Sequence, residues 1–277
     1  MPSSLLRRGR RPSVGDMGSE TPVVRYAVEG AVATVTLNRP EAMNSFNQEL
    51  RASLTDALSQ ASSDNEDRAV VLTGEGRAFS AGADLTAGFP EDKTVEAQLQ
   101  REYRPAFDEI VSMPKPVIAA VNGAAAGIGM SFALAADLAV MGESAFLLAP
   151  FSTISLVPDG GANWFLQKTL GYKRAFQLAI EAERVDAKRC LDWGLVNRVV
   201  ADDTVLSEAQ SWAAALAERA PLSIKATKRA MRHAEAGSWG STFDLEAEIQ
   251  TAVVGSDDNV EGVAAFFEKR KAIFKGS

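Results

Sequence analysis

One segment of the sequence combines residue types that can present bare backbone to a reacting group. It runs from Lys115 to Val140 and reads KPVIAAVNGAAAGIGMSFALAADLAV. Small residues between Gly123 and Gly129 let a ligand approach the main chain, and a helix that begins near Gly127 points free N–H groups and its positive dipole end at that ligand. The segment therefore suits an anion, or an oxygen that becomes anionic during a reaction. Close packing of a helix against a strand explains the same composition equally well.

The sequence contains few side chains that could act as nucleophiles or metal ligands. It has one histidine, His233, and one cysteine, Cys190. These are too few for a His/Cys metal site, and His233 falls in a basic amphipathic pattern typical of a surface helix. A single cysteine forms no internal disulfide, which fits a reducing compartment. We therefore expect no metal, and catalysis that rests on carboxylates and backbone groups.

Alternating strand and helix patterns must position the Lys115–Val140 segment. Two apolar runs around Glu29-Gly30 predict a β-hairpin, and two later runs predict buried strands; the four are Val23–Ala27, Val32–Leu37, Ala69–Thr73 and Pro116–Val121. Ser45 and Gln48 form a predicted capping box that opens a helix, and a further helix is expected near Val95–Val111. This alternation predicts an α/β core with parallel strands buried on both faces.

Only helical patterns remain after about residue 200. Their spacing predicts helices over Leu206–Ala217, Leu222–Ala234, Phe243–Val254 and Val260–Phe274. We therefore divide the chain into a disordered tail (residues 1–20), an α/β core (21–200) and a helical C-terminal subdomain (201–277). Such a subdomain is expected to pack against a neighbouring subunit.

Composition limits the class of protein. The chain has 277 residues, of which 46% are hydrophobic and 23% charged, with a net charge of −7. This charge gives no electrostatic case for binding nucleic acid or an anionic membrane, and no apolar run is long enough to span a bilayer. Four arginines precede the first acidic residue, at positions 7, 8, 10 and 11. They fit a disordered tail better than an organelle transit peptide, so we expect a cytoplasmic protein.

Six segments, in order, resemble the crotonase (enoyl-CoA hydratase/isomerase) superfamily. They are TLNRPEAMNSF (36–46), GEGRAFSAGADL (74–85), KPVIAAVNGAAAGIG (115–129), LVPDGGANWFL (156–166), ERVDAKRCLDWGLVNRVV (183–200) and EGVAAFFEKRKAIFKG (261–276). The resemblance extends from Val23 to Gly276. It implies a crotonase-like (ClpP/crotonase) spiral α/β fold with a C-terminal all-helical subdomain, assembled as a homotrimer or a dimer of trimers. It also implies an acyl-CoA substrate, so CoA belongs to the substrate and no separate cofactor is expected.

The resemblance implies an oxyanion hole of two backbone N–H groups, those of Ala83 and Ile128. They would polarise the thioester carbonyl and hold the enolate that forms when a neighbouring carbon loses its proton. Isoleucine replaces the family's usual glycine at 128, which a backbone donor tolerates. The same resemblance implies CoA contacts at Arg39, Ala42, Ala81, Gly82, Asp84, Leu85 and Lys269, the last reaching an adjacent subunit. For Asp84 we prefer a turn carboxylate that bonds local N–H groups.

Hydratases of this family use two glutamates, one to activate water and one to protonate carbon. The corresponding positions here hold Ser131 and Phe151. Neither side chain can take up a proton at neutral pH, so we do not expect ordinary hydratase activity.

Asp159, in Val157-Pro158-Asp159-Gly160-Gly161, matches the position of the single acid/base of enoyl-CoA isomerases. Moving a double bond from β,γ to α,β needs one base, and an apolar wall of Phe151, Trp164 and Phe165 would raise its pKa toward the working range. Pro-Asp-Gly-Gly before a helix is also a strong signal for a turn or N-cap. Within the family context we favour the catalytic interpretation, and a loop at a helix start can serve both roles.

The sequence therefore predicts an acyl-CoA double-bond isomerase with Asp159 as the acid/base. The segment around Asp159 resembles isomerases of aerobic phenylacetate degradation, which convert a ring-epoxide CoA ester to an oxepin and also shift double bonds. One alternative is a CoA-ester hydrolase or dehalogenase with an aspartate nucleophile, although His233 is poorly placed for dehalogenation. Another is a non-catalytic acyl-CoA binder, because both hydratase glutamates are absent. The acidic composition does not favour RNA binding.

Overall fold

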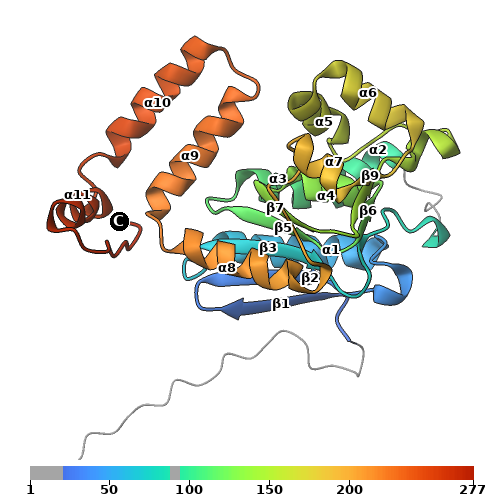
Figure 1. Cartoon of the computed structure of the whole chain (residues 1–277), viewed down its shortest axis with the longest axis horizontal. Helices are drawn as coiled ribbons and strands as arrows, with labels where there is room; N and C mark the ends of the chain where they lie inside the picture. Colours follow the sequence, from blue (N-terminus) through green and yellow to red (C-terminus); the bar gives the residue numbers. More distant parts are fainter. Residues whose placement is uncertain (1–20, 88–93) are drawn as a thin grey trace, which may run out of the picture.

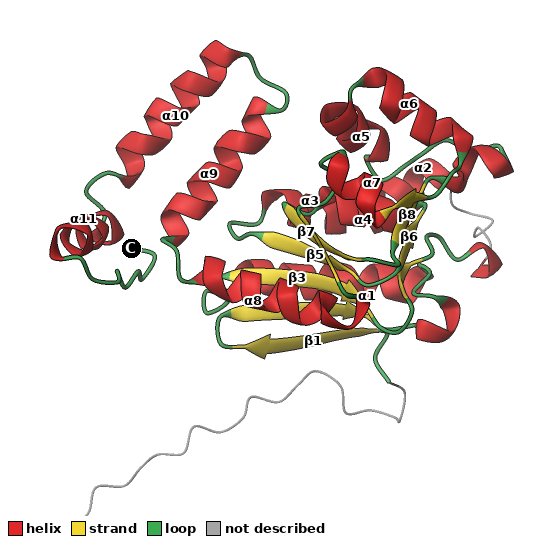
Figure 2. Cartoon of the chain, viewed as in Figure 1, coloured by secondary structure: helices red, strands yellow, loops and turns green. Residues whose placement is uncertain are grey.

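The computed structural model describes residues 21–87 and 94–277. The predicted tail, residues 1–20, lies outside this range. The described chain forms two packed β-sheets, helices that cover them, and a helical C-terminal arm (Figures 1 and 2).

The larger sheet has six strands in the order β1-β2-β3-β5-β7-β10. Only β1 is antiparallel to its neighbour. Its strands are β1 (Val24–Glu29), β2 (Val32–Leu37), β3 (Ala69–Gly74), β5 (Val117–Val121), β7 (Leu138–Gly142) and β10 (Arg198–Val200). Every residue of β2, β3 and β5 is buried. The predicted hairpin and the predicted parallel core are therefore confirmed.

The smaller sheet positions the loops that contain Ala83 and Ile128. Its order is β4-β6-β8-β9, with strands β4 (Ala78–Ser80), β6 (Ala124–Ala126), β8 (Phe146–Leu148) and β9 (Val185–Asp186). Each of β4, β6 and β8 directly follows a strand of the larger sheet, and these three strands are parallel. The chain thus repeats one turn three times, which brings the residues after β4 and after β6 to the same edge.

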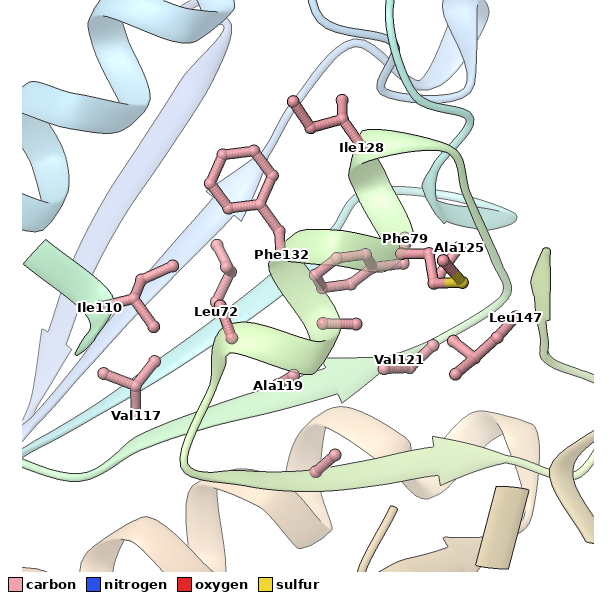
Figure 3. Close-up of a cluster of buried hydrophobic side chains, with 14 of the residues drawn as sticks. Leu72, Phe79, Ile110, Val117, Ala119, Val121, Ala125, Ile128, Phe132 and Leu147 are labelled. Carbon is pink, nitrogen blue, oxygen red and sulfur yellow. The ribbon is translucent and has the colours of Figure 1, made fainter. Parts of the chain in front are cut away.

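The two faces of the larger sheet pack against different helices. Val70 and Leu72 belong to the main core, whereas Val71 faces α8 (Val205–Ala217) together with Ile118 and Val140. The main core contains α1 (Gln48–Ser63), α3 (Arg104–Ser112) and α4 (Ile128–Ala135). Figure 3 shows part of this core around α4, with Phe79 and Phe132 among smaller aliphatic side chains. Side chains that alternate between two buried faces explain the continuous apolar runs.

The helix α1 corrects one prediction. Its N-cap is Asn47, whose side chain accepts a hydrogen bond from Leu50 N at 2.8 Å, so Ser45 and Gln48 do not form a capping box. The helix begins late because Phe46 pairs with Ala83 in a parallel bridge. That tertiary contact keeps the chain extended at the place where the local pattern predicts a cap.

The predicted helix at 95–111 contains an irregular turn. It consists of α2 (Val95–Gln98), a π-helical segment (Leu99–Tyr103) and α3. Helices α5 (Ala162–Leu170), α6 (Tyr172–Glu181) and α7 (Ala187–Asp192) lie on the side of the smaller sheet (Figure 1).

Three helices project from the core: α9 (Pro221–Ala234), α10 (Trp239–Val253) and α11 (Asp257–Glu268) (Figure 1). The last ends at Glu268 rather than at Phe274 as predicted, because Lys269 adopts a left-handed conformation and Arg270 N donates back to Ala265 O. No residue of α9 or α10 is buried, and Trp239, Val260 and Phe267 are 83%, 61% and 77% exposed. The apolar side chains of Val260 and Phe267 on α11 are therefore uncovered within the described chain.

Candidate active site

Two glycine-containing loops lie against each other at the ends of β4 and β6. The two strands are parallel, so the loops that follow them leave the sheet in the same direction. A Cβ atom placed on Gly82 would lie 2.9 Å from Ala126 O and 3.5 Å from Gly127 Cα. The φ angles of Gly82 and Gly127 are +97° and +55°, a region that favours glycine. These contacts bring the two halves of the predicted oxyanion hole together.

The amides of Ala83 and Ile128 are free to act as donors. Phe46 N donates to Gly82 O at 2.8 Å and Asp84 N donates to Phe46 O at 3.1 Å, so the N–H of Ala83 between them points away from Phe46. Ile128 is the first residue of α4, where an N–H has no acceptor within the helix. Among the described residues, neither amide donates a hydrogen bond. The pair could therefore stabilise a negatively charged oxygen.

Two buried polar side chains hold the loop that follows β4 and carries Ala83, and the sequence analysis missed both. Asn44 Nδ2 donates to Ala78 O at 2.8 Å, and Asn44 Oδ1 accepts from Arg39 N at 2.9 Å. Ser80 Oγ donates to Asn44 O at 2.8 Å and accepts from Gly82 N at 3.1 Å. Asn44 has a φ of +55°, a conformation that asparagine tolerates better than most residues. That preference is the one signal in the sequence that could have identified it.

The residues predicted to contact CoA fall into two groups. Arg39 and Asp84 form an ion pair at 3.1 Å, and Ala81 N donates to Met43 O at 2.9 Å, so their two loops are in contact. Ala42 ends a short 3₁₀ turn beside Met43. Leu85 is exposed, on the same loop as Ala81 and Asp84. Lys269 lies at the end of α11, on the opposite side of the chain from these loops (Figure 1). Its contact with a neighbouring subunit stays a prediction.

Asp84 is engaged in its own turn. Its Oδ1 accepts from the Thr86 amide at 3.1 Å and the Thr86 hydroxyl at 2.6 Å. The hydrogen bond from the Thr86 hydroxyl, followed by that from Arg39, lowers the pKa of the carboxyl. Asp84 is therefore an ionised turn carboxylate that fixes the loop beside Ala83.

Asp159 lies between a 3₁₀ turn (Pro150–Ile154) and α5, and its backbone is held from two sides. Its carbonyl accepts from Ala162 N at 3.1 Å and from Ser131 Oγ at 2.8 Å. The carboxyl Oδ1 is buried and has no hydrogen-bond partner in the described part of the chain. Burial raises the pKa of Asp159 to about 6. The helix N-cap is Gly161, so Asp159 does not cap α5, whereas the hydrogen bond from Ala162 N to Asp159 O closes the predicted turn.

The Asp159 loop touches the oxyanion loop directly. A Cβ atom placed on Gly160 would lie 2.8 Å from the ring of Phe107, 2.9 Å from Ile128 Cγ1 and 2.9 Å from Ser131 Cβ. The residue next to Asp159, Gly160, therefore lies against the side chain of Ile128, whose amide is one half of the predicted oxyanion hole. A Cβ with a φ of +59° at Gly160 would leave no room for this contact.

The apolar wall around Asp159 differs in part from the predicted one. Phe151 is 6% exposed and its ring approaches Gly127, whereas Trp164 is 39% exposed. Phe165 packs on Gly161. Phe107, which sequence reasoning missed, stacks on Phe132 with ring centroids 4.1 Å apart, and Phe132 in turn stacks on Phe46 at 4.9 Å. This row of rings connects the Asp159 loop with the Ala83 loop.

Other reactive side chains lie elsewhere. His233 is on α9, 3.3 Å from Ser241 Oγ, and Cys190 is buried with its pKa raised to about 12 by burial. No cluster of three His, Cys, Asp or Glu residues suited to a metal occurs within residues 21–87 and 94–277. No helix in these ranges is long and apolar enough to cross a membrane.

A family model described as enoyl-CoA hydratase/isomerase matches residues 27–277. The chain belongs to the enoyl-CoA hydratase/isomerase family. It is 40% identical over 253 residues to a probable enoyl-CoA hydratase of Rhodobacter capsulatus, covering 91% of this chain and 98% of the relative. It is 38% identical over 258 residues to 1,2-epoxyphenylacetyl-CoA isomerase of Escherichia coli, covering 90% and 97% respectively.

Solved structures agree with the family assignment. A crystal structure of an enoyl-CoA hydratase from Polaromonas sp. JS666 superposes with a TM-score of 0.87 at 36% identity, covering 91% of this chain and 99% of that one. The predicted crotonase fold, with its helical C-terminal region, is confirmed. The chain is thus an enzyme of a family that acts on acyl-CoA thioesters, in which both hydratases and an isomerase are similar to it.

Proposed function

We propose that this enzyme isomerises acyl-CoA thioesters by moving a carbon–carbon double bond from the β,γ to the α,β position. The observation that carries the proposal is the carboxyl of Asp159, whose buried Oδ1 has no partner among the described residues and whose pKa is raised to about 6, on a loop that meets the Ile128 side chain through Gly160. Such a carboxyl is largely ionised at neutral pH, yet it is basic enough to take up a proton and return it.

One carboxyl is sufficient for this reaction. Asp159 removes a proton from the α carbon, and the electron pair moves onto the thioester oxygen to give a dienolate. The Ala83 and Ile128 amides stabilise that oxygen, and losing one such donor typically raises the barrier by about 3 kcal/mol. Asp159 then returns its proton to the γ carbon as the electrons flow back. No proton is gained or lost overall.

The side chains at the hydratase positions support isomerisation over hydration. Addition of water needs a second acid/base, and Phe151 offers none. Ser131 is fully buried and donates its hydroxyl proton to the Asp159 carbonyl. The serine therefore holds the loop that carries Asp159, the proposed single acid/base.

A second reaction at the same site is isomerisation of a ring-epoxide CoA ester. The relative named 1,2-epoxyphenylacetyl-CoA isomerase, at 38% identity, favours it. Both reactions share the thioester, the oxyanion hole and one acid/base, so they differ in the acyl group and not in the residues proposed here.

The decisive experiment replaces Asp159 by asparagine and follows the conjugated α,β-enoyl thioester by absorbance. A panel of β,γ-enoyl-CoAs and one ring-1,2-epoxide CoA ester serve as substrates. Asp159→Asn should abolish turnover and leave binding of the CoA esters largely intact. The control is Asp108→Asn, which makes the same change at an exposed carboxyl of α3 and should keep full turnover.

Parallel assays separate the rival activities. Unchanged turnover in Asp159→Asn contradicts the mechanism. Release of free CoA or halide indicates a hydrolase or dehalogenase, and loss of α,β-enoyl absorbance in water indicates a hydratase. Thermal stabilisation by acyl-CoAs without turnover of any substrate indicates a non-catalytic binder.

We also propose that the active form is a homotrimer or a dimer of trimers. The exposed apolar side chains of α10 and α11 support association, because a monomer rarely leaves such a surface in water. Sedimentation should then give three or six times the 29.5 kDa of the chain.

A further inference from the structure

Tyr103 carries a buried hydroxyl that none of the roles above uses. The residue is 3% exposed, and its hydroxyl has no hydrogen-bond partner among the described residues. Buried polar groups in folded proteins nearly always have a partner, because an unpaired one loses its bonds to water without compensation. Burial also raises the pKa of Tyr103, so the hydroxyl keeps its proton and remains a donor.

The fold places Tyr103 beside residues that contact the Asp159 loop and the Ala83 loop. Tyr103 ends the π-helical segment, an irregularity frequent at functional sites, and lies one turn before Phe107, which contacts Gly160 next to Asp159. The ring of Tyr103 meets the edge of Phe46, which pairs with Ala83, at a centroid distance of 5.9 Å. Burial is the largest cause of the raised pKa of Tyr103, and the charge of Asp159 adds to it.

The ring is fixed, and its proton has no acceptor. The Arg51 guanidinium lies 5.2 Å from the ring centroid and is itself held by Glu102 at 2.8 Å and by Phe46 O at 3.1 Å. Arginine can only donate, so whatever Arg51 offers the phenol oxygen, it cannot accept the hydroxyl proton. Asp159 Oδ1 lacks a partner too, so these two groups do not satisfy each other.

The Tyr103 hydroxyl and Asp159 Oδ1 are two buried polar atoms that lack a partner among the described residues, and a polar ligand would supply one. The thioester oxygen is assigned to the amides of Ala83 and Ile128, and the reacting carbons to Asp159. An oxygen elsewhere on the acyl group is the remaining acceptor for Tyr103. We propose that Tyr103 donates its proton to an oxygen on the acyl part of the substrate and so selects acyl-CoAs that carry a ring ether, epoxide, hydroxyl or keto oxygen over all-carbon ones. This inference rests on the proposed acyl-CoA site and deepens it.

Equilibrium binding of unreactive thioesters tests the inference without requiring turnover. The probes are 2-, 3- and 4-tetrahydropyranylacetyl-CoA, with cyclohexylacetyl-CoA as the all-carbon match, and Kd is measured by calorimetry. Tyr103→Phe should weaken the best-bound ether about tenfold, the loss expected for one hydrogen bond, and change cyclohexylacetyl-CoA by less than about twofold. Tyr172→Phe, at an exposed tyrosine of α6, is the matched control and should change neither.

The opposing outcomes are equally clear. Equal losses for the ether and the carbocycle would mean that Tyr103 only shapes the pocket, and no loss for any ether would mean that it binds no substrate oxygen; either result overturns the inference. Loss of turnover in Asp159→Asn is a separate readout, so a failure of the proposed isomerisation is distinguished from a failure at Tyr103.

Discussion

Replacing Asp159 by asparagine should stabilise the folded chain at alkaline pH while it abolishes the proposed reaction. The folded-state pKa of about 6 lies above the ordinary value of 3.8 because burial disfavours the charged carboxylate. The unfolded chain therefore gains more from ionisation than the folded chain does. Wild-type stability falls as pH rises through this interval, and a neutral asparagine of the same shape avoids the loss.

The magnitude follows from the two pKa values. A shift of about 2 pKa units corresponds to about 3 kcal/mol at pH 8, where the carboxyl is ionised in both states. At pH 4.5 the folded carboxyl is mostly protonated and about 1 kcal/mol remains by the same relation. The advantage of Asp159→Asn in the free energy of unfolding should thus grow by about 2 kcal/mol between pH 4.5 and pH 8.

Urea unfolding of both proteins at the two pH values measures this difference. Protein concentration must be constant, because association shifts apparent stability. Taking the change between pH values cancels any constant effect of the amide. Asp108→Asn should show no such change. The assignment of Asp159 as a desolvated carboxyl would be refuted by two results. One is a difference in the free energy of unfolding that does not change with pH, and the other is a variant whose stability relative to wild type falls as pH rises.

Two further predictions concern the active site. The kcat/KM of wild-type enzyme for β,γ-enoyl-CoAs should decline below a pH of about 6, because Asp159 must be ionised to accept the α proton; a rate profile flat down to pH 5 would argue against this base. Gly82→Ala should lower kcat/KM by about 100-fold, the typical effect of a lost oxyanion donor, because its Cβ would lie 2.9 Å from Ala126 O and displace Ala83. The control is Gly30→Ala, because Gly30 also has a positive φ but a Cβ there would meet no atom within 4 Å. Both variants should shift the thermal unfolding temperature, whereas only Gly82→Ala should lose activity. Equal activity of the two variants would contradict the reasoning.

Patterning within single elements was enough to predict most of the core. The runs that became β3 and β5 are almost wholly apolar and buried at every residue, because both faces of the larger sheet are covered. The failures occurred where tertiary contacts decide. Asn47 caps α1 because Phe46 is held by the Ala83 loop, and the last helix stops at Glu268 because the chain turns back at Lys269.

The site divides in the same way. A run of small residues before a helix is a local signal, so the Ile128 amide could be anticipated. The surroundings of Ser80 and Tyr103 depend on groups that are remote in sequence: Asn44 O for the serine, and Phe46 and Arg51 for the tyrosine. In sequence, a serine at a strand end and a tyrosine in a helix with one apolar face resemble ordinary structural residues.

Ser131 stands at one of the two positions where hydratases carry a glutamate, and it holds the loop of Asp159. The family resemblance assigns its position to a hydratase glutamate, and its Cβ lies 2.9 Å from the position of a Cβ on Gly160. The Asp159 loop thus closes over the space that a longer side chain would occupy, and the serine hydroxyl holds that loop through the Asp159 carbonyl. Under the proposed mechanism, the small side chain at 131 and the placement of Asp159 therefore depend on the same contact. A glutamate restored at 131 would have to displace Gly160, and Asp159 with it.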